Sequence, residues 1–146
     1  MTVEEAICER IEQLGAVTAL VGTRVYLDKL PQAPTYPAVR VQLVDDLSSQ
    51  HLRGPNGLAR GRVQVDAFAH EESGVDPYAQ VARLAAAIHG DGLGPSASGL
   101  EGWIGTLGSP AVEIVECARV LRLRRYDPDE LQVLTMSQDY IVGYRA

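Results

Sequence analysis

The segment Arg60–Ala69 constrains the fold of this chain more than any other stretch. Apolar and mostly polar side chains alternate along it, and a period of two places the two sets on opposite faces of an extended strand. The apolar set is Val63, Val65, Ala67 and Ala69, and the other set is Arg62, Gln64, Asp66 and Phe68. We therefore expect a β-strand that buries its apolar face. Its polar residues Arg62, Gln64 and Asp66 lie on the other face, and nothing in the segment is arranged for catalysis.

A similar alternation over Val39–Leu43 predicts a second strand, which follows an extended, proline-containing stretch at 31–37. The two strands are separated by the segment 48–57, whose sequence SSQHLRGPNG is rich in turn-forming residues and predicts a loop. We expect the two strands to form an antiparallel hairpin. The connection is longer than a hairpin needs, and long loops within compact domains are often functional.

The N-terminal segment has the signature of an amphipathic helix. Thr2 and Glu5 have the spacing of a capping box, in which each side chain bonds to a free backbone amide at the helix start. Apolar residues recur on one face over 3–14, and Gly15 is expected to end the helix. Residues 16–21 can add a short second helical turn.

The second half of the chain repeats the pattern of a helix followed by two strands. Asp76 precedes a proline at the first helical position, and Gly90 is the expected end of this helix. The glycine-rich stretch 90–110 predicts an irregular crossover, in which Trp103 and Ile104 attach the loop to the body. Two strands are then predicted, at 111–123 and 131–144, with a turn between them that starts at Tyr126.

The order of elements is therefore helix, strand, strand, helix, strand, strand. Helices packed on one face of a four-stranded, mainly antiparallel sheet give an α+β fold. A length of 146 residues suits one domain that spans 1–146. Gln138 interrupts the apolar stripe of the last strand, so the pairing register of that strand stays open.

Composition excludes several classes of partner. The 19 acidic residues outnumber the 13 basic ones, and the net charge of −6 argues against a dedicated surface for nucleic acid or anionic membrane. No apolar run approaches the ~20 residues that a membrane-spanning helix needs. Cys8 and Cys117 are too few for a disulfide scaffold, so we expect free thiols in apolar positions, in a soluble protein made in a reducing compartment.

No motif predicts an active site, a metal site or a cofactor. His51, His70 and His89 share no ligand spacing and are expected to be exposed. Asp45 and Asp46 are adjacent in a strand and point to opposite faces, so they do not converge on a cation. The glycines at 90–94 follow a helix, whereas a phosphate-binding loop precedes one.

One basic cluster stands out near the end of the chain. It consists of Arg119, Arg122, Arg124 and Arg125. We expect these arginines to make cross-strand pairs or subunit contacts, and phosphate binding is the alternative.

The signatures also occur in a familiar order. They are LVGTRVY at 20–26, LPQAPTYPAVRV at 30–41, the strand 60–69, the alanine-rich helix, GTLG at 105–108, the turn 126–128 and the strand containing 139–140. In this order they resemble the tail terminator, or tail completion, proteins of long-tailed bacteriophages and related phage-derived particles. The resemblance covers residues 3–145.

The resemblance implies a structural virion protein that is not an enzyme and needs no cofactor. Such proteins form a ring, typically of about six copies, on the head-proximal end of the tail tube. The ring ends tube polymerisation and provides the surface on which the head docks. The implied partners are further copies of the chain, the major tail tube protein and a head-neck connector protein, and no membrane. DNA passes through the lumen without specific binding, which fits the acidic charge. The implied location is the virion tail, and the host cytoplasm during assembly.

Two sets of residues are candidates for contacts with neighbouring subunits or the tube. The loop candidates are His51, Leu52, Arg53, Gly54 and Asn56. The candidates for ion pairs with acids of an adjacent subunit are Arg24, Arg60 and Arg62. With the resemblance, the polar face of the strand 60–69, formed by Arg62, Gln64 and Asp66, becomes a possible subunit surface. For the loop, a mobile segment in solvent is the alternative interpretation.

Two other functions remain open on the sequence. The first is another neck component, such as a head-closure or adaptor protein that binds the portal side. The second is a small cytosolic α+β enzyme or ligand-binding domain, which predicts a concave pocket with converging titratable groups.

Overall fold

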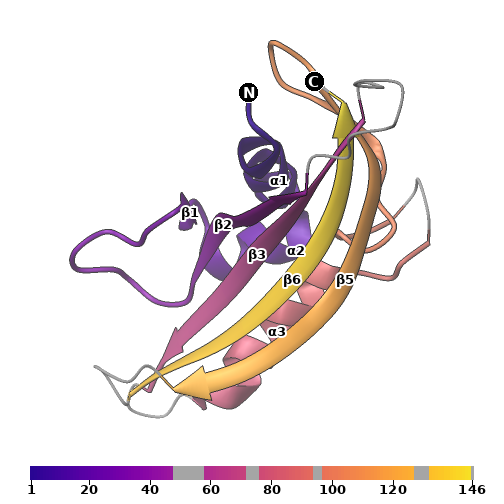
Figure 1. The fold of residues 1–146 in the computed structure, drawn as a ribbon. Coiled ribbons are helices and arrows are strands. Elements are labelled where there is room, and N and C mark those ends of the chain that lie inside the picture. Colours follow the sequence, from indigo (N-terminus) through magenta and orange to yellow (C-terminus); the bar gives the residue numbers. More distant parts are fainter. Residues whose placement is uncertain (48–57, 72–75, 94–96, 127–131, 146) are drawn as a thin grey trace.

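The structure is a computed structural model that describes residues 1–47, 58–71, 76–93, 97–126 and 132–145 (Figure 1). The described residues form helices and strands in the order α1 (Val3–Glu12), α2 (Gly15–Val21), β1 (Val25–Leu27), β2 (Ala38–Leu47), β3 (Ala59–His70), α3 (Pro77–His89), β4 (Gly105–Leu107), β5 (Val112–Tyr126) and β6 (Val133–Arg145). The helices lie together on one face of a sheet, and the long strands bow around them (Figure 1).

The predicted α+β class is confirmed, but the predicted four-stranded sheet is wrong. The described strands form one six-stranded sheet in the order β1-β2-β3-β6-β5-β4. The β1–β2 pair is parallel, and the other neighbours are antiparallel. The two missed strands, β1 and β4, have three residues each. Three residues are too few to show an alternating pattern, so their pairing with β2 and β5 defines them.

The predicted hairpin is confirmed as β2 and β3. Val41 lies opposite Val65, and Val39 lies opposite Ala67. All four side chains are fully buried in the core. The loop predicted over 48–57 lies outside the described residues.

The last strand, β6, buries the polar residue that interrupts its apolar stripe. Gln138 lies on the buried face of β6, is fully buried, and pairs with Val65 of β3 and Arg122 of β5. Its side-chain amide donates to the carbonyl of Ala85 at 3.1 Å, so burial leaves its N–H group partnered. The strand β5 continues to Tyr126, where the turn was predicted to start, because these residues pair with β6. The other turn residues, 127–131, are not described.

Both predicted helix starts are confirmed. At α1 the Thr2 amide donates to Glu5 Oε2 at 2.6 Å, and the Glu5 amide donates to Thr2 Oγ1 at 3.3 Å. At α3 the Tyr78 amide donates to the capping carboxylate of Asp76 at 3.0 Å. Gly15 does not end α1, which stops at Glu12; it begins α2 instead.

The crossover after α3 packs on the body through some of its residues. Leu100 is fully buried and Trp103 is nearly so, whereas Ile104 is exposed. The guanidinium carbon of Arg10 lies 4.8 Å from the centre of the Trp103 ring. The predicted anchoring role therefore holds for Trp103 and is wrong for Ile104.

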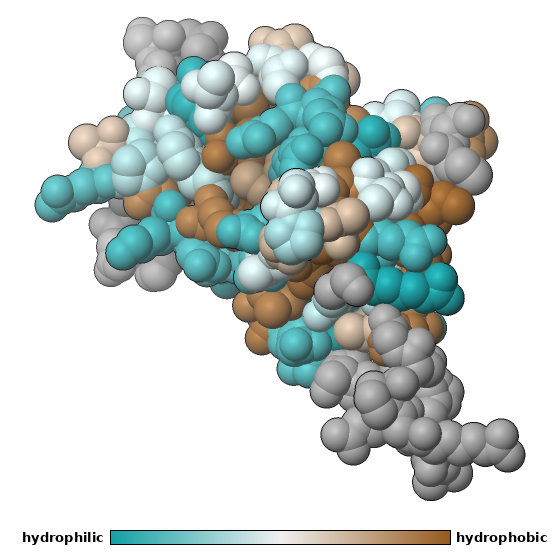
Figure 2. All heavy atoms as spheres, turned by 90° about the horizontal axis from the view of Figure 1, so that it is seen from above, coloured by the Kyte–Doolittle hydropathy of each residue, from teal (hydrophilic) through white to brown (hydrophobic). Residues whose placement is uncertain are grey.

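Seen from above, hydrophilic and hydrophobic residues are interspersed on the surface (Figure 2). Among the helices that the structure describes, none combines the length and apolar character that crossing a membrane requires.

Candidate assembly surface on strand β5

Strand β5 has a long unpaired edge. The short strand β4 pairs with it only at Val112–Ile114. The crossover bonds to this edge at the Cys117 carbonyl and the Arg119 amide, and from Val120 to Tyr126 no described strand lies on the side of β5 away from β6. Unpaired backbone N–H and C=O groups on such an edge are a template for pairing with another chain.

The same stretch exposes large apolar side chains. Among the described residues nine large hydrophobic side chains are exposed, and four of them lie within residues 120–126. Their relative exposures are 54% for Val120, 44% for Leu121, 48% for Leu123 and 54% for Tyr126. A gathering of exposed apolar side chains on one edge marks an interaction surface, whereas single scattered ones do not.

The register of β5 explains this exposure. Arg122 and Arg124 lie opposite β6 residues that face the helices, whereas Leu121 and Leu123 lie opposite β6 residues on the other face. Directly opposed residues share a face of the sheet. A sheet normally turns apolar side chains toward the helices that cover it, but here the arginines lie on the helix side and the leucines on the uncovered side. The alternation of leucine and arginine is visible in the sequence LRLRR at 121–125. Only the register shows which face of the sheet each set occupies. We use the name β5 surface for Val120, Leu121, Arg122, Leu123, Arg124 and Tyr126.

A cationic pocket adjoins the β5 surface on the helix side. It has a volume of about 280 Å³ and is lined by Tyr78, Arg122, Arg124 and Met136. The guanidinium carbon of Arg124 lies 4.7 Å from the centre of the Tyr78 ring, a cation–π contact. Two guanidinium groups in one pocket suit an anionic group such as a carboxylate.

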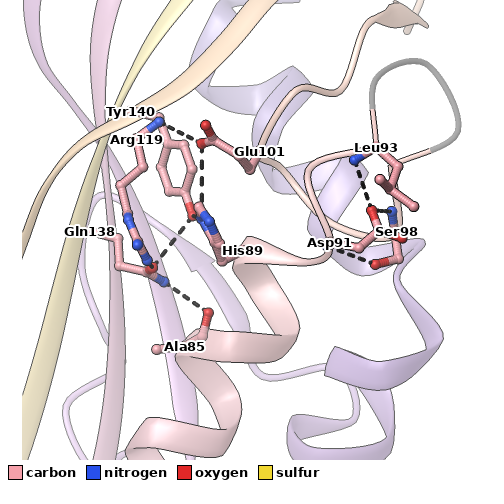
Figure 3. A network of polar contacts seen from close by, with 9 residues as sticks. All are labelled: Ala85, His89, Asp91, Leu93, Ser98, Glu101, Arg119, Gln138 and Tyr140. Carbon is pink, nitrogen blue, oxygen red and sulfur yellow. Dashed lines mark hydrogen bonds and ion pairs between the residues drawn. The ribbon is translucent and has the colours of Figure 1, made fainter.

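A network of polar contacts attaches β5, at Arg119, to β6, the end of α3 and the crossover (Figure 3). Arg119 donates through Nη1 to Gln138 Oε1 at 2.8 Å, which confirms the predicted cross-strand pairing for this arginine. The backbone amide of Arg119 donates to Glu101 Oε2 at 2.7 Å. The Tyr140 hydroxyl lies 3.1 Å from His89 Nδ1 and donates to Gln138 Oε1 at 3.5 Å. These contacts join β5, β6, the end of α3 and the crossover.

Two titratable groups of the network, His89 and Tyr140, are shifted toward their uncharged forms. Burial lowers the pKa of His89, and the positive charge of Arg119 lowers it further, while Glu101 acts in the opposite direction. Burial raises the pKa of Tyr140. His89 is half-buried rather than exposed, so that prediction is wrong for this histidine. The reason is the packing of α3 against β6.

Two glycines place Glu101 in this network. A Cβ at Gly99 would lie 2.5 Å from the backbone nitrogen of Gly90, so neither position has room for a side chain. The close approach lets the amides of Leu100 and Glu101 donate to the last carbonyls of α3, those of Ile88 and His89, at 2.8 and 3.0 Å. The crossover is thereby fixed to the end of α3.

The opposite face of the sheet contains buried charges. The carboxylate of Asp66 is fully buried and accepts hydrogen bonds from Arg40 and from Ser137 Oγ. Asp139 is 4% exposed and pairs with Arg62 at 2.7 Å. The expectation that Asp66 belongs to a subunit surface is therefore wrong, because strands β2 and β6 supply its partners and cover it.

The three predicted contact arginines have partners within the chain. Arg24 Nε donates to the carbonyl of Pro37 at 2.9 Å. Arg60 pairs with Glu116 at 3.1 Å, and both side chains are exposed. Arg62 pairs with Asp139. The structure does not bring the three arginines together at one site, and their contact with an adjacent subunit stays a prediction.

The loop candidates His51, Leu52, Arg53, Gly54 and Asn56 lie outside the described residues. Their role also stays a prediction. Within the part of the chain that the structure describes, no three His, Cys, Asp or Glu side chains gather as a metal-binding group. Cys8 is half-buried and Cys117 buried, both as free thiols, and burial raises their pKa values to about 11 and about 12.

Comparisons with known proteins agree with the architecture. No curated protein matches the chain. Among solved structures, the fold is similar to a chain from "Virion of native gene transfer agent (GTA) particle", with a TM-score of 0.61 and 18% sequence identity. The alignment covers 99% of this chain and 95% of that chain. At this identity the similarity shows a shared fold.

The family comparison is decisive because it covers nearly the whole chain. The family described as tail completion protein gp17 matches residues 5–140. The match begins within α1 and ends within β6, so it includes the β5 surface and the network that anchors it. This chain belongs to the tail completion protein gp17 family, and it is a structural protein of a phage-like tail or neck.

Proposed function

We propose that this chain forms a ring that caps the head-proximal end of a tail tube, ends polymerisation of the tube and provides the surface on which the head docks. Membership of the tail completion family and the fold shared with a virion chain support this function. The observation that carries it is the β5 surface, where an unpaired strand edge coincides with four exposed apolar side chains. Such a surface serves association and requires no chemistry.

The unpaired edges of the sheet favour assembly of several copies into a ring. The two outer strands of this sheet, β1 and β4, are both short, so longer parts of β2 and β5 are left without a neighbour. When one edge meets a different patch of the next copy, the contact repeats around an axis and closes if the rotation per step divides a full turn. Several modest contacts made at once hold such a ring on a tube more strongly than one contact does.

The proposed partners are other copies of the chain, the major tail tube protein on one side and a head-neck connector protein on the other. The proposed location is the virion tail, after assembly in the host cytoplasm. DNA would pass through the ring without specific binding. The net charge of −6 supports this, because a positively charged wall retains DNA through its phosphates.

Negative-stain microscopy of the purified chain, with and without tail tubes, tests the proposal. We expect rings of about six copies at one end of each tube, and tubes that stop growing once capped. Leu121→Ser with Leu123→Ser should abolish capping. Leu93→Ser is the matched control, because Leu93 is also an exposed leucine, at 70%, and lies outside the β5 surface. Free monomers that ignore tubes, or binding only to the head connector, would contradict the proposal.

A further inference from the structure

A second unpaired edge lies on the other side of the sheet. Strand β1 pairs with β2 only at Val39–Val41. Beyond this point, no described strand lies on the side of β2 away from β3. The end of this edge is exposed: Val44 has a relative exposure of 53%, and Asp45 and Asp46 are exposed as well. A bulge between Leu43 and Asp45 separates it from the regular part of the strand.

The two unpaired edges have opposite charges. The end of β2 carries the carboxylates of Asp45 and Asp46, and neither forms an ion pair with another described residue. The β5 surface carries Arg122 and Arg124, for which the described residues likewise supply no carboxylate partner. Several other charges of the sheet are paired within the chain, as Arg62 is with Asp139 and Arg40 with Asp66.

The fold prevents these charges from meeting within one chain. Strands β3 and β6 lie between β2 and β5 in the sheet. The register also places them at opposite ends, because Asp46 lies opposite Gly61, which pairs with β6 at Val142, whereas Arg124 pairs with β6 at Met136. Any contact between the acidic end of β2 and the β5 surface is therefore a contact between two copies.

Charge also selects the symmetry of that contact. If two copies met through their β5 surfaces around a twofold axis, the arginines of one would face those of the other. Like charges across an interface oppose association, whereas opposite charges favour it. A contact from β2 to β5 is heterologous, because it uses a different patch on each copy, and this is the type of contact that builds rings.

We propose that the partner of the β5 surface is the acidic end of β2, Val44–Asp46, of a second copy of this chain. The carboxylate of Asp46, which lies on the helix side of β2, enters the pocket of about 280 Å³ that Arg122 and Arg124 line, and Asp45 adds negative charge at the same edge. Val44 covers part of the exposed apolar side chains of β5. The inference rests on the proposed ring and names the two surfaces that join its subunits.

Charge reversal on each side tests the pairing. One variant combines Asp45→Arg with Asp46→Arg, and the other combines Arg122→Glu with Arg124→Glu. Each alone should lower the fraction of chains in rings, at a fixed concentration, by at least about tenfold. An equimolar mixture of the two variants should form rings of alternating copies, because the β2 end of each variant then meets a β5 surface of opposite charge. The chain that contains all four changes should form rings again.

The matched control reverses charges outside both surfaces. Glu12 and Arg83 are exposed, so Glu12→Arg with Arg83→Glu alters the charge pattern without touching either edge. Thermal melting of every variant identifies any that fails to fold.

Disulfide formation between copies provides a second, independent measurement of the contact. In a Cys8→Ser background, Asp46→Cys with Arg122→Cys should give a disulfide-linked ladder of copies, whereas Asp46→Cys with Leu93→Cys should not.

The outcomes separate this inference from the proposed function. If the unaltered chain caps tubes as rings but both reversed variants do so equally well, the pairing is wrong and the ring remains. If only the β5 variant fails, and the fourfold change does not restore rings, the β5 surface binds something other than β2, such as the tube protein. If the unaltered chain forms no ring on tubes, the proposed function itself fails.

Discussion

The guanidinium of Arg40 donates two hydrogen bonds to a single oxygen of Asp66, from Nε at 3.0 Å and from Nη2 at 2.7 Å. The other oxygen of Asp66 accepts a hydrogen bond from Ser137 Oγ at 2.5 Å. The two partners come from β2 and β6, the strands on either side of β3. One fully buried carboxylate therefore ties three neighbouring strands together on the face that no described helix covers.

Replacing this carboxylate should destabilise the fold strongly. We expect Asp66→Ala to lower the free energy of unfolding by about 3 kcal/mol, because it leaves a largely buried guanidinium and a buried hydroxyl without their acceptor. Denaturant unfolding followed by circular dichroism measures this change. Glu116→Gln is the control: its ion pair with Arg60 is exposed on both sides and should contribute less than about 1 kcal/mol. Equal losses for the two variants would contradict the assigned role of Asp66.

The contact between Gly90 and Gly99 predicts a second stability effect. Gly99→Ala should lower the free energy of unfolding by about 1–3 kcal/mol, because its Cβ would meet backbone atoms that cannot move aside without opening the end of α3. Gly15→Ala is the control, because no atom lies within 4 Å of a Cβ at that helical position. It should leave stability unchanged or raise it by up to about 1 kcal/mol. Thermal melts of both variants decide the point.

His89 predicts how stability depends on pH. Its pKa in the folded chain lies below the usual value of 6.5, chiefly because of burial. As pH falls below 6.5, the unfolded chain takes up a proton on this side chain before the folded chain does, so folding loses stability. Above 6.5 both states are neutral at this position, and the stabilisation is fully present. His89→Gln should therefore lose less stability than the unaltered chain between pH 7.5 and pH 5.5.

Denaturant midpoints of both chains at the two pH values measure this difference. The carboxylates titrate in both chains and cancel in the comparison. Equal losses of stability in the two chains would rule out His89 as a source of the pH dependence.

The exposed leucines of β5 predict a loss of assembly without a loss of folding. Leu121→Ser with Leu123→Ser should change the melting temperature little, because nearly half of each side chain is exposed in the single chain. Capping of tubes should fall sharply, because the apolar contact is lost. Sedimentation of tubes with and without the variant quantifies capping. A variant that melts early and still caps would contradict the assignment of these leucines to the assembly surface.

Much of the local structure could be predicted because its causes lie within a few residues of each other. The capping box of Thr2 and Glu5, the Asp76 cap and the alternation in β2 and β3 are of this kind. The sites of contact were harder to predict. The candidate arginines have partners within the chain, and the β5 surface was missed because the sequence does not show which strand has no neighbour.

The amino-acid sequence by itself determined the α+β class, the β2–β3 hairpin, the starts of α1 and α3, and the resemblance to the family to which the chain belongs. Only the three-dimensional packing showed that the described strands form one six-stranded sheet, that Gln138 and Asp66 are buried, and that the arginines and leucines of β5 face opposite ways. The physical reason is that these properties depend on partners distant in the sequence. A buried polar group is stable only with a hydrogen-bonding partner, and an edge is unpaired only relative to the strands that surround it.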